Sequence, residues 1–323
     1  MARRTWTTDE LVAGVRAGDQ RALARSISLV ENGDADGPAV VRALYPDTGS
    51  AFAVGITGPP GVGKSSLVAG LVHHVRGLRL SVGVVSVDPS SPFTKGALLG
   101  DRIRLADHFL DSGVFIRSMA TRGHLGGLAE ATLQSLLLMD AAGRDVIFLE
   151  TVGAGQSEVE VAGIADVVAL VLMPGSGDSV QALKAGIMEI PDVIAINKMD
   201  QPGARELQND IRNVMALAPD HGSDPAIVLT EALRGEGVVE LWDALAARRD
   251  SLAANGELEE RRGRNLAAEV IASATARARR AIDRAISEDQ SLAELVESVT
   301  RRETDPLTAA DRIAAAVIRG KPE

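Results

Sequence analysis

Apolar residues in the middle of the chain occur as short runs with helical segments between them. In the clearest run, Val167-Val168-Ala169-Leu170-Val171-Leu172, six apolar residues follow one another. Continuous runs of this kind are typical of strands that helices cover on both faces. The pattern predicts seven strands, at residues 51–57, 80–87, 113–117, 145–150, 167–172, 192–197 and 226–229. Because strands alternate with helices, we predict an α/β fold class with a doubly wound, mainly parallel sheet.

The N-terminal segment has a helical pattern instead. Thr7 and Glu10 have the spacing of a capping box, and Leu11 and Val15 follow at helical spacing. A second helix is expected after Asp19, because apolar residues again recur at helical spacing there. We therefore expect an N-terminal helical extension over residues 1–48.

Strand signals stop in the last quarter of the chain. Leu266, Val270 and Ala274 recur there every four residues, in a segment rich in Ala, Arg and Glu. The sequence thus predicts an α/β domain over residues 49–250 and a C-terminal helical region over residues 251–323. A tail with such a narrow apolar face cannot form a core alone, so we expect it to pack on the α/β domain or on a second chain. A two-fold symmetric homodimer is the default arrangement.

Composition narrows the classes of function. The chain has 323 residues, of which 46% are hydrophobic, which is enough for a substantial core. It has no Cys, which excludes disulfides and thiolate metal sites. The 44 acidic and 34 basic residues give a net charge of −10, which argues against nucleic acids and anionic membrane surfaces as partners. No apolar run approaches the ~20 residues of a membrane span, and no secretory signal is present, so we expect a cytoplasmic protein.

A glycine-rich string follows the first predicted strand. It reads Gly58-Pro59-Pro60-Gly61-Val62-Gly63-Lys64-Ser65 and is followed by Ser66, which fits the phosphate-loop pattern G-x-x-x-x-G-K-[ST]. Glycines let backbone N–H groups curl around an anion, and the helix that follows adds its N-terminal dipole. Lys64 can then reach the β- and γ-phosphates of a nucleotide, and the Ser65 hydroxyl can take a coordination site of Mg²⁺.

A second string, Asn197-Lys198-Met199-Asp200, ends the predicted strand at 192–197. The Asp200 carboxylate has two acceptor oxygens that match the ring N–H and the exocyclic NH₂ of guanine, a donor pair that adenine lacks. Lys198 can lay its alkyl stem along the base. Together the two strings predict a protein that binds GTP and GDP.

Three acidic residues lie where a nucleotide hydrolase places its metal ligands. Asp88 follows the second predicted strand, Asp101 comes soon after, and Glu150 ends the fourth predicted strand. Carboxylate oxygens suit Mg²⁺, either directly or through water, so we expect the metal at Ser65 and these three residues. Gln156 is a candidate for positioning the attacking water, although a glutamine there has many structural uses.

Two further loops at strand ends are candidates for function. The string Met173-Pro174-Gly175-Ser176-Gly177-Asp178 is glycine-rich and has Lys184 on the helix after it. The loop that begins with Thr230 follows the last predicted strand, where backbone N–H groups of a second guanine-contacting loop usually meet the base. We expect the base contacts there at Glu231, Ala232 and Leu233.

The chain resembles the MeaB/ArgK-like branch of the P-loop GTPases, the methylmalonyl-CoA mutase-associated proteins, over roughly residues 5–320. Its Asp-Pro-Ser-Ser-Pro and Glu-Thr-Val-Gly strings are more specific for this family than the phosphate loop is. The matching strings are Gly58–Ser66, Val87–Pro92, Gly100–Arg104, Glu150–Gly153, Pro174–Asp178 and Asn197–Asp200.

The resemblance implies a homodimeric GTPase that acts as a chaperone for adenosylcobalamin-dependent methylmalonyl-CoA mutase. In such proteins GTP binding and hydrolysis gate the loading of the cofactor and protect the mutase from inactivation. It implies Mg²⁺ near Ser65, Asp88, Asp101 and Glu150. It also implies that residues 173–187 form a further switch, in which Lys184 swings toward the nucleotide when a partner binds. We expect the catalytic residues to be Lys64, Asp101, Glu150 and Lys184.

One position departs from the family pattern. The second guanine loop usually has a small or hydroxylated residue where this chain has Glu231, so the base contact there is open. Two other functions also remain open: a GTPase that delivers a metal, and a P-loop kinase, in line with an older description of the family as a transport-system kinase. The absence of Cys and the presence of only five His weigh against metal delivery, and the N-K-x-D string favours a GTPase over a kinase.

Overall fold

The computed structural model describes residues 6–88, 108, 110–120, 127–151, 163–175, 191–217 and 225–319. The chain divides into two compact units, Met1–Leu266 and Ala267–Glu323. The first unit holds the whole sheet, whereas the second is helical.

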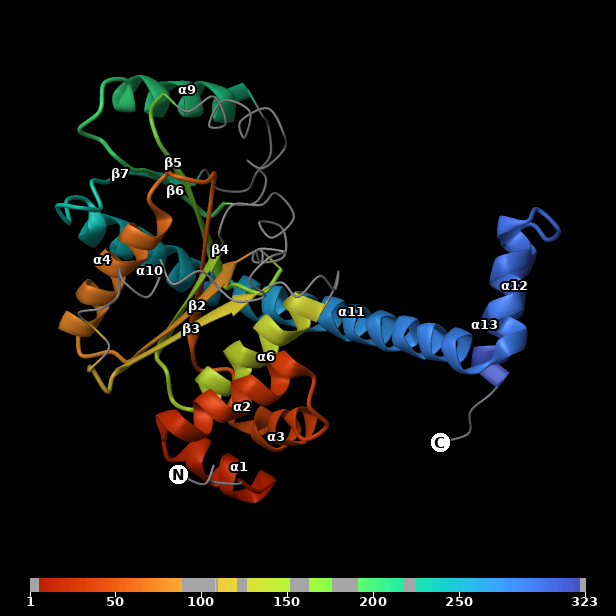
Figure 1. The fold of residues 1–323 in the computed structure, drawn as a ribbon. Helices are drawn as coiled ribbons and strands as arrows, with labels where there is room; N and C mark the ends of the chain where they lie inside the picture. Colours follow the sequence, from red (N-terminus) through yellow and green to blue (C-terminus); the bar gives the residue numbers. More distant parts are fainter. Residues whose placement is uncertain are drawn as a thin grey trace. The chain divides into compact units, whose positions relative to one another are not determined.

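Seven parallel strands form one sheet in the first unit (Figure 1). The strands are β1 (Phe52–Thr57), β2 (Val82–Asp88), β3 (Val114–Ala120), β4 (Val146–Thr151), β5 (Val167–Leu172), β6 (Val193–Ile196) and β7 (Ala226–Leu229). Their order in the sheet is β3-β2-β4-β1-β5-β6-β7, and every neighbouring pair is parallel. Each strand predicted from the apolar runs is present, and the doubly wound α/β fold is confirmed.

Helices cover both faces of this sheet, which explains why most positions of the strands are apolar. Side chains alternate between the two faces along a strand. Phe52 and Val54 of β1 pack with α4 (Lys64–Gly77) and α10 (Val238–Ala254). Ala53 between them faces the opposite layer, which includes α6 (Gly127–Ala141). Beside β5 and β6, α9 (Ala204–Leu217) contributes Leu207 and Ile211 to a third apolar cluster.

The N-terminal helices belong to the same core as the sheet. They are α1 (Thr8–Arg16), α2 (Gln20–Asn32) and α3 (Gly37–Leu44), followed by the short 3₁₀ helix η1 (Tyr45–Asp47). The predicted capping box is confirmed, since the Glu10 N–H donates to the Thr7 hydroxyl and the Thr7 N–H donates to the Glu10 carboxylate. Leu23 and Ile27 of α2 are fully buried in the cluster that contains α6. These helices therefore close one face of the sheet.

The C-terminal helices are α11 (Glu257–Glu288), α12 (Gln290–Thr300) and α13 (Pro306–Arg319). The division between the two units falls within α11, so its first turns belong with the sheet. In the second unit α12 and α13 pack against each other. Val270, Ile271 and Leu307 are exposed by 68–78% in this unit. Much of its apolar surface is therefore uncovered in the single chain.

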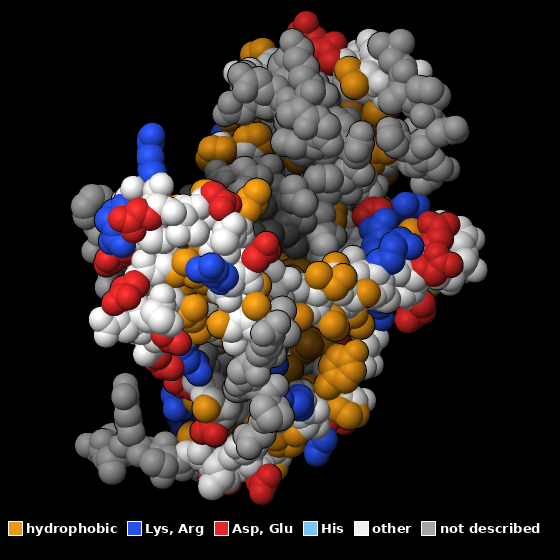
Figure 2. All heavy atoms as spheres, turned by 90° about the vertical axis from the view of Figure 1, so that its right-hand side faces the viewer, with side chains coloured by type: hydrophobic (Ala, Val, Ile, Leu, Met, Phe, Trp, Pro, Cys, Tyr) orange, Lys and Arg blue, Asp and Glu red, His pale blue; other side chains and the backbone are white. Residues whose placement is uncertain are grey.

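The surface carries both signs of charge. Figure 2 shows acidic and basic side chains intermixed on the face that it draws. Within the described ranges, none of the helices combines the length and the apolar character that a membrane crossing requires.

An aspartate lies directly before each of three strands: Asp145 before β4, Asp166 before β5 and Asp192 before β6. Each carboxylate accepts a hydrogen bond from a backbone N–H in, or directly before, the neighbouring strand. The donors are Ser81 to Asp145 at 2.7 Å, Ala53 to Asp166 at 2.9 Å and Val168 to Asp192 at 2.9 Å. These contacts fix where neighbouring strands begin at the amino edge of the sheet.

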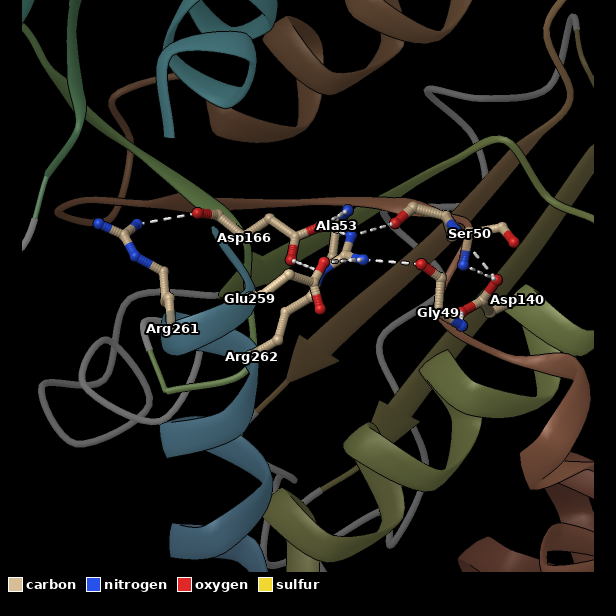
Figure 3. Close-up of polar contacts among 9 residues, drawn as sticks. Gly49, Ser50, Ala53, Asp140, Asp166, Glu259, Arg261 and Arg262 are labelled. Atoms are coloured by element: carbon tan, nitrogen blue, oxygen red, sulfur yellow. Dashed lines mark hydrogen bonds and ion pairs between the residues drawn. The ribbon is translucent and has the colours of Figure 1, made fainter. Parts of the chain in front are cut away.

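Arginines of α11 neutralise two of these aspartates, and Figure 3 draws one of them, Asp166, with Arg262 beside it. Arg262 makes a bidentate contact with Asp166, with both nitrogen–oxygen distances at 2.7 Å, and also donates to the carbonyl oxygens of Gly49 and Ala51. Arg261 donates to the Asp192 carboxylate at 2.7 and 3.1 Å. The Asp166 side chain is only 5% exposed, so its charge depends on this partner. The start of α11 is therefore fixed to the sheet.

We expect Arg262→Ala to lower the free energy of unfolding by about 3 kcal/mol, because it leaves a buried carboxylate and two carbonyl groups without their donor. Urea unfolding measures this change. Arg264→Ala is the matched control, since Arg264 lies on the same helix, is 69% exposed and meets Glu260 only at 3.6 Å. Arg264→Ala should lower the free energy of unfolding by less than about 0.5 kcal/mol. Equal costs for the two variants would contradict the role given to Arg262.

Candidate functional site

The candidate site lies at the carboxyl edge of the sheet, opposite the aspartates. The loops after β1, β4, β5, β6 and β7 leave the sheet at this edge. From β1 the chain proceeds to strands on one side and later to strands on the other, so β1 lies at the topological switch point. Ligands of open α/β sheets bind in the crevice at this point.

The phosphate loop connects β1 to α4 and depends on two glycines. Gly58 has φ +139°, and a Cβ there would lie 2.1 Å from the carbonyl oxygen of Val171. Gly63 has φ +95°, and a Cβ there would lie 2.4 Å from Nδ2 of Asn197. Both positions therefore require glycine for backbone angle and for space. The loop is packed directly against β5 and against the N-K-x-D string.

Lys64 begins α4 and is buried, with 6% exposure. Its ammonium group donates to the carbonyl oxygens of Gly58 at 2.6 Å and Pro59 at 3.0 Å. The side chain thus curls back over the phosphate loop rather than pointing into solvent. A cation held over such a loop, at the N-terminus of a helix, forms a favourable environment for phosphate groups.

Ser65 and Glu150 come together, as the sequence predicts for two residues near one metal ion. The Ser65 hydroxyl donates to Oε1 of Glu150 at 2.5 Å. Glu150 lies near the end of β4 and is 2% exposed. A hydroxyl and a carboxylate are hard oxygen ligands, so this pair fits Mg²⁺. Among the residues with described positions there is no cluster of three or more His, Cys, Asp or Glu that could hold a metal.

Asn197 connects the two nucleotide strings. Its Nδ2 donates to the carbonyl oxygen of Val62 at 2.8 Å, and its Oδ1 accepts from the Thr230 hydroxyl at 3.2 Å and the Ala232 N–H at 3.0 Å. The residue is 2% exposed. One buried amide therefore joins the phosphate loop, the end of β6 and the loop after β7.

Lys198 crosses from the same string to the phosphate loop. Its backbone is left-handed, with φ +58°, which is uncommon for a residue other than glycine. Its ammonium group donates to the carbonyl oxygen of Gly61 at 2.9 Å and lies 3.2 Å from the sulfur of Met173. The backbone angle thus directs this long side chain over the phosphate loop.

At the far end of the site, the interaction between the side chains of Glu231 and Asp200 raises the pKa of Glu231 above its usual range and lowers the pKa of Asp200. Glu231 is 6% exposed, and its Oε1 also accepts the Leu233 N–H at 3.3 Å. Leu233 itself is 86% exposed. The sequence predicts these residues as base contacts but gives no sign that the two acids meet.

Several predicted residues lie outside the described residues. They are Asp101, Gln156 and Lys184, together with residues 89–92, 152–157 and 176–178. Asp88 is the last residue of β2, and its side chain is not described. The predictions for these residues therefore stay predictions.

Sequence reasoning missed the contacts that support the site. Thr57 and Thr151 face each other across β1 and β4, with a hydroxyl–hydroxyl distance of 3.3 Å. At the opposite edge it missed the strand-leading aspartates, although the repeated Asp-Val pairs at 145–146, 166–167 and 192–193 were a usable signal. An aspartate before an apolar strand can accept the unpaired N–H of a neighbouring strand start.

Comparison with known families agrees with this geometry. The family model described as "Methylmalonyl Co-A mutase-associated GTPase MeaB" matches residues 23–287, which is most of the chain. The chain belongs to the MeaB family of GTPases. It is accordingly a P-loop GTPase, which binds GTP and GDP, and the resemblance noted in the sequence is confirmed.

Individual relatives support membership of the MeaB family. A protein of Pyrococcus abyssi that carries a GTPase name is 45% identical over 316 residues, covering 97% of each chain. GTPase ArgK of Escherichia coli is 35% identical over 264 residues, covering 79% of this chain and 80% of its own. The mouse protein named methylmalonic aciduria type A homolog, mitochondrial, is 34% identical and covers 79% of this chain and 66% of its own.

A solved structure shares the MeaB-family fold. The crystal structure described as a LAO/AO transport system kinase aligns with a TM-score of 0.70. The alignment covers 98% of this chain and 99% of that one, at 24% sequence identity. At this identity the similarity supports the fold alone.

We expect Asn197→Ala to weaken GTP binding by at least about tenfold and to lower the free energy of unfolding by about 2–4 kcal/mol. The substitution removes three hydrogen bonds and leaves buried polar groups of two loops without a partner. Nucleotide titration and urea unfolding measure the two effects. Asn255→Ala is the control, because Asn255 is exposed and makes only a 3.4 Å contact with Glu257. Unchanged binding by Asn197→Ala would contradict its connecting role.

Proposed function

We propose that this GTPase is a chaperone of an adenosylcobalamin-dependent methylmalonyl-CoA mutase. In this proposal GTP binding and hydrolysis gate the loading of the mutase cofactor and protect the mutase from inactivation. The observation that carries it is the match to the mutase-associated family, which extends from α2 through nearly all of α11. The mouse relative, named for methylmalonic aciduria, supports the same assignment.

We assign the nucleotide to the groups at the carboxyl edge of the sheet. The phosphate loop Gly58–Ser66 would hold the phosphates, with Lys64 as the cation for the β- and γ-phosphates. Asn197, Lys198 and Asp200 would hold the guanine from one loop, and Glu231–Leu233 from the other. The packing of Gly63 against Asn197 supports this assignment, because it sets the two groups of residues side by side.

We propose that Mg²⁺ is the metal of this site. Ser65 and Glu150 would hold it, together with Asp88 and Asp101, directly or through water. The contact between the Ser65 hydroxyl and the buried Glu150 carboxylate supports this choice, because both oxygens lie at the start of α4. When bound, such an ion would supply positive charge that offsets the charge developing on the phosphate during hydrolysis.

Selection of guanine rests on Asp200 in this proposal. Asp200→Asn should weaken GTP binding and favour xanthosine triphosphate, because the amide mispairs with guanine and matches the extra carbonyl of xanthine. One charge-assisted hydrogen bond to the base is lost and another is mispaired, which should weaken the free energy of GTP binding by about 2–4 kcal/mol. Parallel titrations with the two nucleotides measure the change. GTP affinity equal to that of the unaltered protein would refute this role.

Coupling to the mutase should act on the rate of hydrolysis. We propose that Lys184 is repositioned toward the γ-phosphate when the mutase binds, through the segment after Met173-Pro174-Gly175. A cation supplied as an arginine finger raises the rate of hydrolysis by a factor of about 10³–10⁵. A lysine lacks the bidentate fork of arginine, so it should raise the rate by a smaller factor. We expect slow intrinsic hydrolysis, strong stimulation by the cognate mutase, and loss of most of that stimulation in Lys184→Ala with GTP binding intact.

Steady-state phosphate release with and without the mutase tests this coupling. Lys184→Arg is the matched variant, since it keeps the charge and should keep much of the stimulation. Equal stimulation of Lys184→Ala and the unaltered protein would remove Lys184 from the mechanism. Absence of stimulation in both would count against the mutase as partner.

We also propose that the chain is a homodimer that pairs through its C-terminal helices. The exposed Val270, Ile271 and Leu307 support this, because a small helical unit gains stability when a second copy covers such residues. Sedimentation of the full-length chain should give a dimer at micromolar concentration. A Val270→Glu, Ile271→Glu double variant should shift it to monomer with GTP binding intact, whereas a monomeric unaltered chain would refute the proposal.

A further inference from the structure

We propose that Ser86 of β2 is a positioning residue of the metal site. Its buried hydroxyl donates to the Glu150 carboxylate when Mg²⁺ is bound, and so fixes the orientation in which that carboxylate faces the ion. The inference rests on the proposed Mg²⁺ site at Ser65 and Glu150. It concerns a residue that lies outside the phosphate loop and the N-K-x-D string.

Ser86 and Glu150 lie side by side on neighbouring strands. In the parallel pairing of β2 with β4, Ser86 is the register partner of Glu150. Neighbouring strands lie about 4.8 Å apart, and register partners of a parallel pair have their side chains on the same face of the sheet. The preceding pair on that face, Val84 and Phe148, packs in the apolar cluster that contains α4. Ser86 and Glu150 therefore both face the layer of α4, the helix on which Ser65 lies.

The hydroxyl of Ser86 lacks the partner that a buried polar group normally has. The residue is fully buried, and within the described part of the chain its oxygen makes no hydrogen bond. Because this oxygen is inaccessible to solvent, bulk water does not replace the missing partner. A buried hydroxyl without a hydrogen bond is costly. Such a group beside a metal-binding carboxylate indicates that the two meet in the loaded state of the site.

The register gives Ser86 two neighbours across the strands, and both are polar. Glu150 of β4 is one, and Ser118 of β3 is the other. The Ser118 hydroxyl is also buried without a partner among the residues with described positions. A hydrogen bond to a charged acceptor is roughly twice as strong as one between neutral groups. The Ser86 hydroxyl therefore donates to Glu150, and its own lone pairs remain as acceptors for Ser118.

The demands of Mg²⁺ explain what this donor contributes. Oε1 of Glu150 already accepts the Ser65 hydroxyl, at 2.5 Å, so one donor reaches the carboxylate from α4. Mg²⁺ requires near-ideal octahedral geometry of its ligands and their waters. A carboxylate beside the ion keeps one orientation when further hydrogen bonds hold it. Ser86 supplies such a bond from the sheet, whereas Ser65 supplies one from the helix.

The stability of the protein without ligands separates this role from a structural one. Ser86→Ala removes a hydroxyl that lacks a partner, so the free energy of unfolding without nucleotide and Mg²⁺ should not fall. Ser26→Ala is the matched control, because Ser26 of α2 is also fully buried and its hydroxyl has no partner in the described ranges. The two variants should behave alike in urea unfolding. A loss of stability in Ser86→Ala alone would assign Ser86 to the fold and overturn the inference.

A Mg²⁺ titration tests the positioning role directly. The protein is mixed with a fluorescent, non-hydrolysable GTP analogue, and the midpoint is the Mg²⁺ concentration that gives half of the change in bound analogue. Loss of a group that orients a metal ligand weakens metal binding by about 10–100-fold, so Ser86→Ala should raise the midpoint at least about tenfold. Its affinity for the analogue in EDTA should equal that of the unaltered protein. Ser26→Ala should match the unaltered protein in both measurements.

Two further variants show whether Ser86 acts through Glu150. Glu150→Ala should raise the Mg²⁺ midpoint, and the addition of Ser86→Ala to it should raise the midpoint no further, because the acceptor is gone. Ser118→Ala should have a smaller effect than Ser86→Ala, since Ser118 adjoins Ser86 and not Glu150. An equal effect of Ser86→Ala with and without the Glu150 carboxylate would overturn the inference.

The outcomes distinguish this inference from the metal assignment on which it rests. If Ser86→Ala keeps the Mg²⁺ midpoint of the unaltered protein while Glu150→Ala raises it, the role of Ser86 fails and the metal assignment stands. If Glu150→Ala also keeps the midpoint, the assignment of Mg²⁺ to Glu150 fails, and the role of Ser86 fails with it. Equal weakening of analogue binding by Ser86→Ala in EDTA and in Mg²⁺ would also overturn the inference, because the effect would not depend on the metal.

Discussion

The side-chain amide of Asn197 is the contact on which the nucleotide site depends. Its donor and acceptor satisfy backbone and hydroxyl groups from the phosphate loop and from the loop after β7. A buried amide that meets several partners is costly to disturb, because each lost contact leaves a polar group without water. The phosphate loop and the loop after β7 are therefore held at a fixed separation.

The opposite edge of the sheet is organised by charge. Asp166 and Asp192 bind backbone N–H groups at strand starts, and Arg262 and Arg261 of α11 neutralise them. β5 and β6 therefore start at residues fixed to α11 and end at loops of the site, Met173 and Asn197. The same two strands meet α11 at one end and the loops of the candidate site at the other.

Within the site, two pairs of oxygens show how different neighbours change one kind of group. The Glu150 carboxylate accepts a hydrogen bond from the Ser65 hydroxyl. Glu231 interacts with another carboxyl group, which raises its pKa and so favours its neutral form. Residue type alone would assign both as acidic ligands, but their neighbours in the fold differ.

The apolar runs determined the seven strands, because strands covered on both faces are apolar at most of their positions. The glycine-rich string and N-K-x-D determined GTP as ligand, since both act through local backbone geometry and residue chemistry. Tertiary structure alone decided that Ser65 meets Glu150, that Asn197 joins two loops, and that Glu231 meets Asp200. Ser65 and Glu150 lie 85 residues apart in sequence, the partners of Asn197 lie 33 to 135 residues from it, and Asp200 and Glu231 lie 31 residues apart. Only strand order and register bring residues that are so far apart in sequence together.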